Sequence, residues 1–424
     1  MPRNSSWEAV DSAITEGAEA AFSFLERLVA APSTVGQEMA AQQVVAAELD
    51  RRGFEVTALS IPAAVAERAP GGVAQVSYTG RPDILGQMNR GAAPSLLLNG
   101  HVDVVPADPG TWTSDPFTPV RRDGWLIGRG AGDMKGGFAM GLLAVSALRQ
   151  AMPDAISGEL GFLSVIEEEC TGNGTLAACQ QGVLGDAVVL LEPTDLGLML
   201  GGTGVLWADV EVQGVSAHAE SADRAVNPVD HIPLILRALA SLEDELGRTG
   251  EDPAFADVAR PYVVNPGLVS AGDWASSVPA RARVGVRVGF PRRWSPDEAL
   301  ARLRAQIAAA TTKDPWLSVH PPEVRASGFR AEGYLIDEAD PLVGALAAAH
   351  AAAHAGAAPR RFVLGATTDA RYYLNQFGVP AVAYGPRSRN IHGADEAVEL
   401  ASIVAGARTL ARFIAAFFTT EDAR

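Results

Sequence analysis

Three apolar runs in the first half of the chain each end just before a side chain that can bind a metal ion. The runs are residues 96–98, followed by His101, residues 160–166, followed by Glu167, Glu168 and Glu169, and residues 187–191, followed by Glu192. Short apolar runs without alternation are typical of strands buried on both faces of a largely parallel sheet. Open α/β sheets bind ligands outside the carboxyl ends of their strands, so three such ends predict a metal centre.

The other patterns place helices and strands around this sheet. Helical spacing extends over residues 7–51 with a stop at Pro32, and it returns at 138–148, 342–354 and 398–418. Residues 54–59 and 381–384 are predicted strands. Residues 60–93 are rich in Pro, Gly and Ala without clear periodicity, which predicts a loop with room for one strand.

The composition shifts near Gly201, and a separate small domain is predicted over residues 206–322. Its predicted strands are 206–212, 262–270, 281–288 and 316–320, and its predicted helices are 228–246 and 296–310. This βαββαβ order fits a ferredoxin-like sandwich. The small domain therefore interrupts an α/β catalytic domain that is formed by residues 1–205 and 323–424.

Charge and cysteine content narrow the range of possible partners and cellular locations. The chain has 424 residues, 34 of them basic and 50 acidic, and its formal charge of −16 argues against nucleic acid or an anionic membrane as a partner. Two cysteines, Cys170 and Cys179, form no disulfide framework. The N-terminal segment lacks the apolar stretch of a signal peptide, and no window reaches the roughly 18 uninterrupted apolar residues of a membrane helix. We expect a cytoplasmic protein.

His101, Asp103 and Asp133 carry candidate chemistry beyond the strand ends. In an extended backbone His101 and Asp103 point to the same side, and a carboxylate so placed can hold the tautomer of a metal-binding histidine. Asp133 lies in the glycine-rich segment 128–137, before the apolar helix. Such glycines suggest close backbone approach to a ligand, although the spacing fits no phosphate-binding fingerprint. A simple helix cap is the alternative for Asp133.

Five motifs, in a fixed order, resemble one protein family. They are His101-Val102-Asp103, residues 130–135, Glu168-Glu169, Glu192-Pro193 and residues 390–393. They resemble the co-catalytic zinc hydrolases that include acetylornithine deacetylase, succinyl-diaminopimelate desuccinylase, aminoacylase and glutamate carboxypeptidase. The resemblance covers nearly the whole chain. It implies an α/β catalytic domain with a mostly parallel sheet, interrupted by a ferredoxin-like dimerisation or lid domain.

The resemblance also implies a centre of two zinc ions, with Co²⁺ or Mn²⁺ as alternatives. Asp133 would bridge the ions, and the remaining ligands would be His101 and Glu192 for one ion, and Glu169 and His392 for the other. Asp103 would orient His101, and Glu168 would be the general base. The family's triplet begins with Asp where this chain has Glu167, so Glu167 or Glu168 remains open as the base.

This ligand set agrees with the chemistry of zinc. Nitrogen and oxygen donors without thiolates are typical of catalytic zinc. Three ligating carboxylates and a bridging hydroxide balance the charge of two Zn²⁺ ions. A pair of ions about 3.5–4 Å apart would acidify a shared water and polarise a substrate carbonyl.

The resemblance extends to residues of the inserted domain. His218 would reach across a dimer and stabilise the oxyanion in the partner's active site; the alternative is a surface histidine. Asn227, Asn265 and Arg287 resemble substrate-contacting positions, and Arg287 would clamp a carboxylate. Residues 368–371 also resemble a family motif near the site, without an assigned role.

Two other groups of residues have competing interpretations. His350 and His354 have the helical spacing of a zinc site, but no nearby carboxylate completes it. Cys170 beside the glutamates has no paired histidine, which favours a small buried residue over a nucleophile.

Together these features predict a homodimeric, zinc-dependent amidohydrolase. Its expected substrate is an N-acyl amino acid such as N-acetylornithine, or a related small amide that carries a carboxylate. A dipeptidase or glutamate-type carboxypeptidase with the same centre is the first alternative. A non-catalytic binding protein is the second, and it is disfavoured because no ligand or base position is lost.

Overall fold

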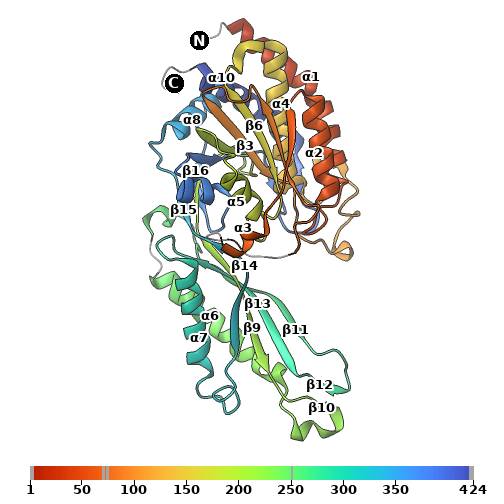
Figure 1. Cartoon of the computed structure of the whole chain (residues 1–424), viewed down its shortest axis with the longest axis vertical. Helices are drawn as coiled ribbons and strands as arrows, with labels where there is room; N and C mark the ends of the chain where they lie inside the picture. Colours follow the sequence, from red (N-terminus) through yellow and green to blue (C-terminus); the bar gives the residue numbers. More distant parts are fainter. Residues whose placement is uncertain (1–3, 69–71, 73–75, 250–251, 420–424) are drawn as a thin grey trace.

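The computed structural model describes residues 4–68, 72, 76–249 and 252–419. The chain forms a large body and a smaller, elongated body, and Figure 1 shows both termini in the large body, far from the small one. The chain leaves the large body once and returns once. This arrangement agrees with the predicted insertion of one unit into another.

A mixed nine-stranded sheet forms the centre of the large body. Its order is β1-β2-β6-β3-β7-β17-β8-β15, and β16 pairs with β8. Its strands are β1 (Glu55–Leu59), β2 (Asp83–Met88), β3 (Ser95–His101), β6 (Glu159–Val165), β7 (Ala187–Leu190), β8 (Leu198–Gly202), β15 (Tyr334–Leu335), β16 (Arg361–Leu364) and β17 (Ala381–Ala383). The four central strands, from β6 to β17, are parallel as predicted, whereas β1 and β2 are antiparallel.

Helices cover both faces of this sheet. In β3, Leu96 and Leu98 join one core cluster and Leu97 joins the other, because successive side chains of a strand point to opposite faces. The helices of the large body are α1 (Asn4–Val29), α2 (Met39–Arg51), α3 (Ala63–Arg68), α4 (Gly136–Ala151), α5 (Asn173–Gln180), α8 (Pro341–Ala353), α9 (Ala370–Tyr372) and α10 (Leu400–Thr419). The segment predicted as a loop contains α3 and the buried strand β2, which shows no alternation because nearly all of its residues are buried.

Helix α10 is long and apolar enough to cross a membrane by length and composition, but more than half of its apolar stretch is buried inside the protein. Its Ile403, Leu410 and Phe413 belong to the main core, and the helix packs on α4 and α8. We interpret α10 as a core helix.

The large body also carries a small sheet of four short strands, namely β4 (Val120–Arg122), β5 (Trp125–Ile127), β18 (Ser388–Arg389) and β19 (Ala397–Glu399).

The small body has the predicted βαββαβ order. Its antiparallel sheet has the order β11-β13-β9-β14, and one face packs on two helices. The elements are β9 (Gly204–Gln213), α6 (Ile232–Thr249), β11 (Val264–Ala271), β13 (Arg281–Phe290), α7 (Pro296–Thr311) and β14 (Glu323–Ala331). The short strands β10 (Ala217–His218) and β12 (Ser277–Val278) pair at the end farthest from the large body (Figure 1).

The prediction of a fourth strand at 316–320 is wrong. The amides of Trp316 and Leu317 donate to the carboxylate of Asp314, and Trp316 stacks on His320, so this segment is a turn. The fourth strand is β14, which pairs with β9 up to Ala331. The sheet therefore continues past the predicted boundary at 322.

Candidate metal centre

His101 lies at the carboxyl end of the central strand β3 and is 2% exposed. Its Nδ1 lies 2.9 Å from the carbonyl oxygen of Asp103. Since a carbonyl only accepts, this bond places the ring proton on Nδ1. The free Nε2 then faces carboxylate oxygens of Asp133 at 3.2 Å and of Glu192 at 3.9 Å. A metal-binding histidine has this arrangement, with one nitrogen fixed by the protein and the other turned to the ion.

Asp103 supports His101 differently from the prediction. Its carboxylate lies 3.7 Å from Nδ1 of His101, beyond hydrogen-bond distance, and the backbone carbonyl holds the ring instead. The carboxylate accepts hydrogen bonds from the backbone amides of Glu168, at 3.2 Å, and Glu169, at 3.1 Å. Burial raises the pKa of Asp103 to about 7. Asp103 thus connects the end of β3 to the segment that follows β6.

Two clusters of donor atoms meet at the strand ends, and Asp133 belongs to both. One cluster contains His101, Asp133 and Glu192, and the other contains Asp133, Glu169 and His392; within each, the donor atoms lie within 4.8 Å of one another. Nε2 of His392 lies 3.0 Å from Glu169 and 3.5 Å from Asp133. These are the five predicted ligands, brought together in the predicted division.

The electrostatics of the centre fit divalent cations. Burial raises the pKa of Glu192 to about 8, and it raises the pKa of Glu168 well above its usual range. Burial disfavours the charged form of His392, but hydrogen bonds with Asp133 and Glu169 outweigh it and raise the pKa of His392 to about 11. Several buried carboxylates in one place need positive charge, and nitrogen and oxygen donors suit Zn²⁺ or a similar ion.

The two candidate bases occupy different environments. Glu167 is fully buried, and its carboxylate binds Arg81 at 2.9 Å, Tyr78 at 2.8 Å and Thr171 at 2.9 Å. Glu168 instead lines the cavity at the centre, 4.0 Å from Nε2 of His101, and belongs to neither donor cluster. The geometry therefore favours Glu168 over Glu167 as the base.

The matches to known proteins agree with this geometry. A family model described as Peptidase family M20/M25/M40 matches residues 97–416. The chain belongs to this family. Like its relatives, it is a hydrolase.

Sequence relatives in the family remove acyl groups, according to their names. Succinyl-diaminopimelate desuccinylase of Methylobacterium nodulans is 32% identical over 361 residues, which cover 82% of this chain and 87% of that protein. N-formyl-4-amino-5-aminomethyl-2-methylpyrimidine deformylase of Bacillus subtilis is 28% identical, covering 80% and 83%. A dipeptidase from Saccharomyces cerevisiae is similar in fold, with a TM-score of 0.81 at 15% identity, covering 98% and 99%.

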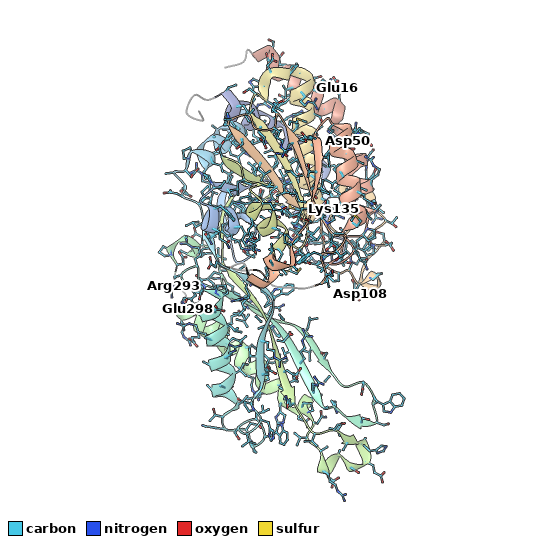
Figure 2. The ribbon with its side chains drawn as sticks, in the orientation of Figure 1. Glu16, Asp50, Asp108, Lys135, Arg293 and Glu298 are labelled. Carbon is cyan, nitrogen blue, oxygen red and sulfur yellow. The ribbon has the colours of Figure 1, made fainter. Side chains whose placement is uncertain are left out.

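The glycine-rich segment serves packing in this member of the M20 family. A Cβ at Gly137 would lie 1.9 Å from the carbonyl oxygen of Leu191, so this glycine lets α4 lie against the end of β7. Asp133 makes no helix-capping hydrogen bond, which removes the alternative role. Lys135, buried in the large body (Figure 2), donates to the carbonyls of Leu28 at 2.9 Å and Ala31 at 3.2 Å.

A buried ion pair that the sequence interpretation missed links two predicted ligands. The carboxylate of Glu396 accepts from the backbone amides of Gly132, at 3.0 Å, and Asp133, at 2.9 Å. Arg129 pairs with Glu396 and also donates to the carbonyl of His392 at 3.3 Å. Arg129 and Glu396 are 2% and 1% exposed. Both residues lie close to ligand motifs in the sequence, and this position could have indicated their role, because a charged residue beside a ligand motif often orients it.

The motif at 368–371, left without a role, packs on the glutamate segment. Arg371 is buried, lies 3.2 Å from Asp369 and donates to the carbonyl of Thr171 at 3.1 Å. Tyr372 donates to the same carbonyl at 3.0 Å. These contacts hold the segment that carries Glu168 and Glu169.

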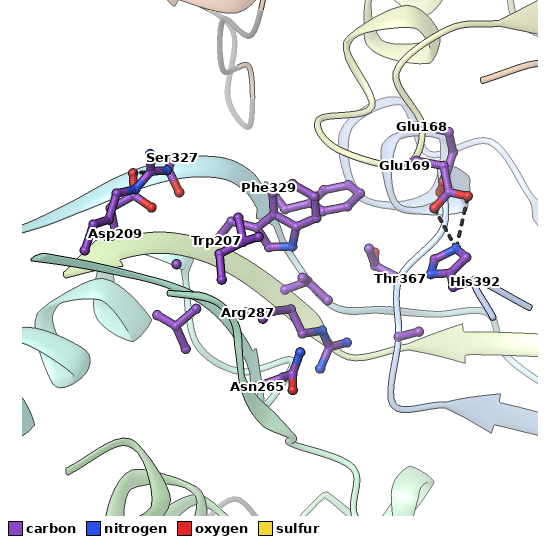
Figure 3. A pocket seen from close by; sticks show the side chains of 17 residues that line it. Glu168, Glu169, Trp207, Asp209, Asn265, Arg287, Ser327, Phe329, Thr367 and His392 are labelled. Carbon is purple, nitrogen blue, oxygen red and sulfur yellow. Dashed lines mark hydrogen bonds and ion pairs between the residues drawn. The ribbon is translucent and has the colours of Figure 1, made fainter. Parts of the chain in front are cut away.

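A cavity of about 620 Å³ extends from the metal centre to the uncovered face of the small sheet (Figure 3). Asn265 and Arg287 line it, as do Glu168 and His392. Asn227 does not; its side chain caps the turn at Val229 with a bond of 3.1 Å.

His218 lies apart from the metal centre within this chain. It is exposed, and its Nδ1 accepts from the backbone amide of Glu220 at 3.2 Å. Its strand β10 lies at the far end of the small body (Figure 1).

The other candidate residues have structural partners. His350 is buried and bonds to Tyr384 at 3.0 Å, and His354 bonds to Thr409 at 3.1 Å. Cys170 is buried, and burial raises the pKa of its thiol far above the usual range.

Proposed function

We propose that the protein is a di-zinc amidohydrolase that removes the acyl group from an N-acyl amino acid, such as N-acetylornithine, or from a related small amide with a carboxylate. The main support is the pair of donor clusters that share Asp133, beside Glu168, which belongs to neither cluster. The cavity that leads to them contains the guanidinium of Arg287. The names of the sequence relatives, a desuccinylase and a deformylase, favour acyl removal.

The roles follow from where the side chains lie. When bound by His101, Glu192, Asp133, Glu169 and His392, two divalent ions would acidify a water and polarise the amide carbonyl. Glu168 takes the proton of the attacking water on its free carboxylate oxygen. The water oxygen bonds to the carbonyl carbon, the carbon–nitrogen bond breaks, and Glu168 passes the proton to the leaving amine. Arg287 and Asn265 hold the substrate carboxylate.

The proposed active unit is a homodimer. His218 is exposed at the far end of the small body, so it can serve a centre in a second copy rather than in its own chain. The neighbouring edge strand β11 exposes Leu268 at 68% and Val269 at 58%, and Trp274 beyond it is 72% exposed. An exposed apolar edge strand favours pairing with another strand.

Subunit mixing tests the cross-dimer role. Glu168→Gln and His218→Ala subunits should each be inactive as homodimers. Their hybrid contains one site with an intact Glu168 and an intact His218, so an equal mixture should recover about a quarter of wild-type activity. No recovery in hybrids verified by native mass spectrometry would refute the role of His218.

Metal removal tests the main proposal. Dialysis against a chelator should abolish hydrolysis of N-acetyl amino acids, and addition of Zn²⁺ should restore it at two ions per chain. Co²⁺ and Mn²⁺ are compared in the same way. Unchanged turnover in protein shown by elemental analysis to be metal-free would contradict the proposal.

A dipeptidase is the second candidate, favoured by the fold similarity to the yeast dipeptidase. Comparing kcat/KM for N-acetyl amino acids and for dipeptides on the same metal-loaded preparation separates the two.

We also propose a cytoplasmic location, which suits two free, buried cysteines.

A further inference from the structure

One row of side chains crosses the cavity-facing side of the small sheet. Asn265 lies opposite Arg287, and Arg287 lies opposite Trp207, in the register of β11, β13 and β9. Phe329, on β14, packs edge-on against Trp207, with ring centroids 5.3 Å apart at 90°. All four line the cavity (Figure 3). The row is polar at one end and aromatic at the other.

The aromatic end depends on local departures from a regular sheet. A Cβ at Gly328 would lie 2.4 Å from Cε3 of Trp207, so only glycine lets the indole lie over β14 there. The pairing of β14 with β9 is irregular between Ala326 and Arg330, which brings Phe329 beside the indole. Phe329 is 7% exposed, whereas Trp207 remains half-buried and open to the cavity.

The polar end carries a positive charge without an acidic partner. Arg287 donates to the carbonyls of Gly365, at 2.7 Å, and Val263, at 3.2 Å, and it forms no ion pair within the described residues. The other arginine in the cavity, Arg283, is neutralised by Asp209 at 2.7 Å. A carboxylate of the substrate therefore has one unmatched guanidinium to bind, directly across from Trp207.

We infer that this row selects substrates that carry an aromatic ring next to their carboxylate. The carboxylate binds Arg287 and Asn265, and the ring packs on Trp207 and Phe329. This inference rests on the proposed function, because it names the amino acids whose N-acyl derivatives the centre hydrolyses. Aromatic rings pack favourably on an indole in offset or edge-on geometry.

The test compares kcat/KM for N-acetyl-phenylalanine and N-acetyl-alanine on zinc-loaded protein. Wild type should favour the phenylalanine derivative by about 10-fold or more, as expected for burying a ring. Trp207→Ala should bring the ratio close to one, and Trp207→Phe should keep most of it.

Trp316→Ala is the matched control. It removes an indole of the same small body that lies outside the cavity lining, where its N–H donates to the carbonyl of Gln213 at 2.8 Å. The ratio is independent of the fraction of folded enzyme, so this variant should keep the wild-type value. A wild-type ratio near one, or an unchanged ratio in Trp207→Ala, would overturn the inference.

Calorimetric binding of 3-phenylpropanoate and propanoate gives a readout without turnover. Wild type should bind 3-phenylpropanoate about 10-fold more tightly or better, and Trp207→Ala should lose this preference. Preferential binding without hydrolysis of any amide would support the aromatic subsite and refute the proposed reaction. Hydrolysis of amides without any aromatic preference would refute the subsite alone.

Discussion

On the large-body wall of the cavity Glu168 is buried and the half-exposed His392 is held by Asp133 and Glu169, whereas on the small-body wall side chains project from alternate positions of an uncovered sheet. Glu396, which supports the first wall without lining the cavity, is 1% exposed and bonds to two backbone amides. Trp207 on the second wall is half-buried, and its position depends on a neighbouring glycine. We propose that the first wall determines metal binding and the second determines substrate choice. Substitutions on either wall test whether metal binding and substrate choice are separate.

The largest effect is expected at Glu168. Glu168→Gln should lower kcat by about 10²–10⁴-fold, the usual contribution of a general base. Because Glu168 belongs to neither donor cluster, metal content and melting temperature should stay at the wild-type values. Elemental analysis and steady-state kinetics on one preparation check both expectations. A variant with wild-type turnover would show that another group takes the proton.

A smaller effect is expected at Glu396. Glu396→Gln removes the charge that binds Arg129 and weakens the hold on the amide of Asp133, so zinc affinity should fall by about 10–100-fold. Competition with a chromogenic chelator measures this affinity without turnover. Glu399→Gln is the matched control, since Glu399 pairs with the half-exposed Arg387 instead. Equal affinities in the two variants would contradict a positioning role for Glu396.

On the opposite wall, Arg287→Met should raise KM for a carboxylate substrate by about 10-fold or more, the value of a lost bond to a charged group. For the corresponding amide without a carboxylate, KM should stay the same, and zinc affinity should also be unchanged. Loss of zinc from this variant would show that the two walls are not separate.

The smallest effect on activity is expected at His350, remote from both walls. Burial, followed by the neighbouring His354, lowers the pKa of His350 to about 4. The unfolded chain protonates this histidine near pH 6.5, so the free energy of unfolding should fall as the pH falls from about 6.5 to 4. In His350→Gln this decrease should be smaller, and at pH 7.5 activity should be unchanged. Urea titrations at several pH values measure this, with the exposed His320→Gln as control.

The sequence was most informative where local order determines position. The carboxyl ends of β3, β6 and β7 meet because neighbouring parallel strands end at the same edge, so His101, Glu169 and Glu192 could be predicted to converge. The prediction of a strand at 316–320 was wrong because backbone amides bind the carboxylate of Asp314 and form a turn there, despite the short apolar pattern. One strand was allowed for in the segment 60–93, but β2 could not be located there because burial on both faces leaves no alternation.

Contacts between distant segments could not be predicted in the same way. Whether Asp103 supports His101 through its carbonyl or its carboxylate depends on side-chain directions that spacing does not specify. The pairing of Arg129 with Glu396 joins residues from distant parts of the chain. The row from Asn265 to Phe329 depends on strand register and on the irregular pairing near Gly328, which a pattern of apolar residues does not reveal.

The points where the chain leaves and re-enters the large body are paired neighbours, Gly202 with Tyr334. Adjacent exit and return points mean that a short turn can join the two ends without stretching the sheet. We therefore propose that the small body can be exchanged as a unit, and that grafting it between relatives would exchange selectivity while the metal-binding residues of the large body stay unchanged.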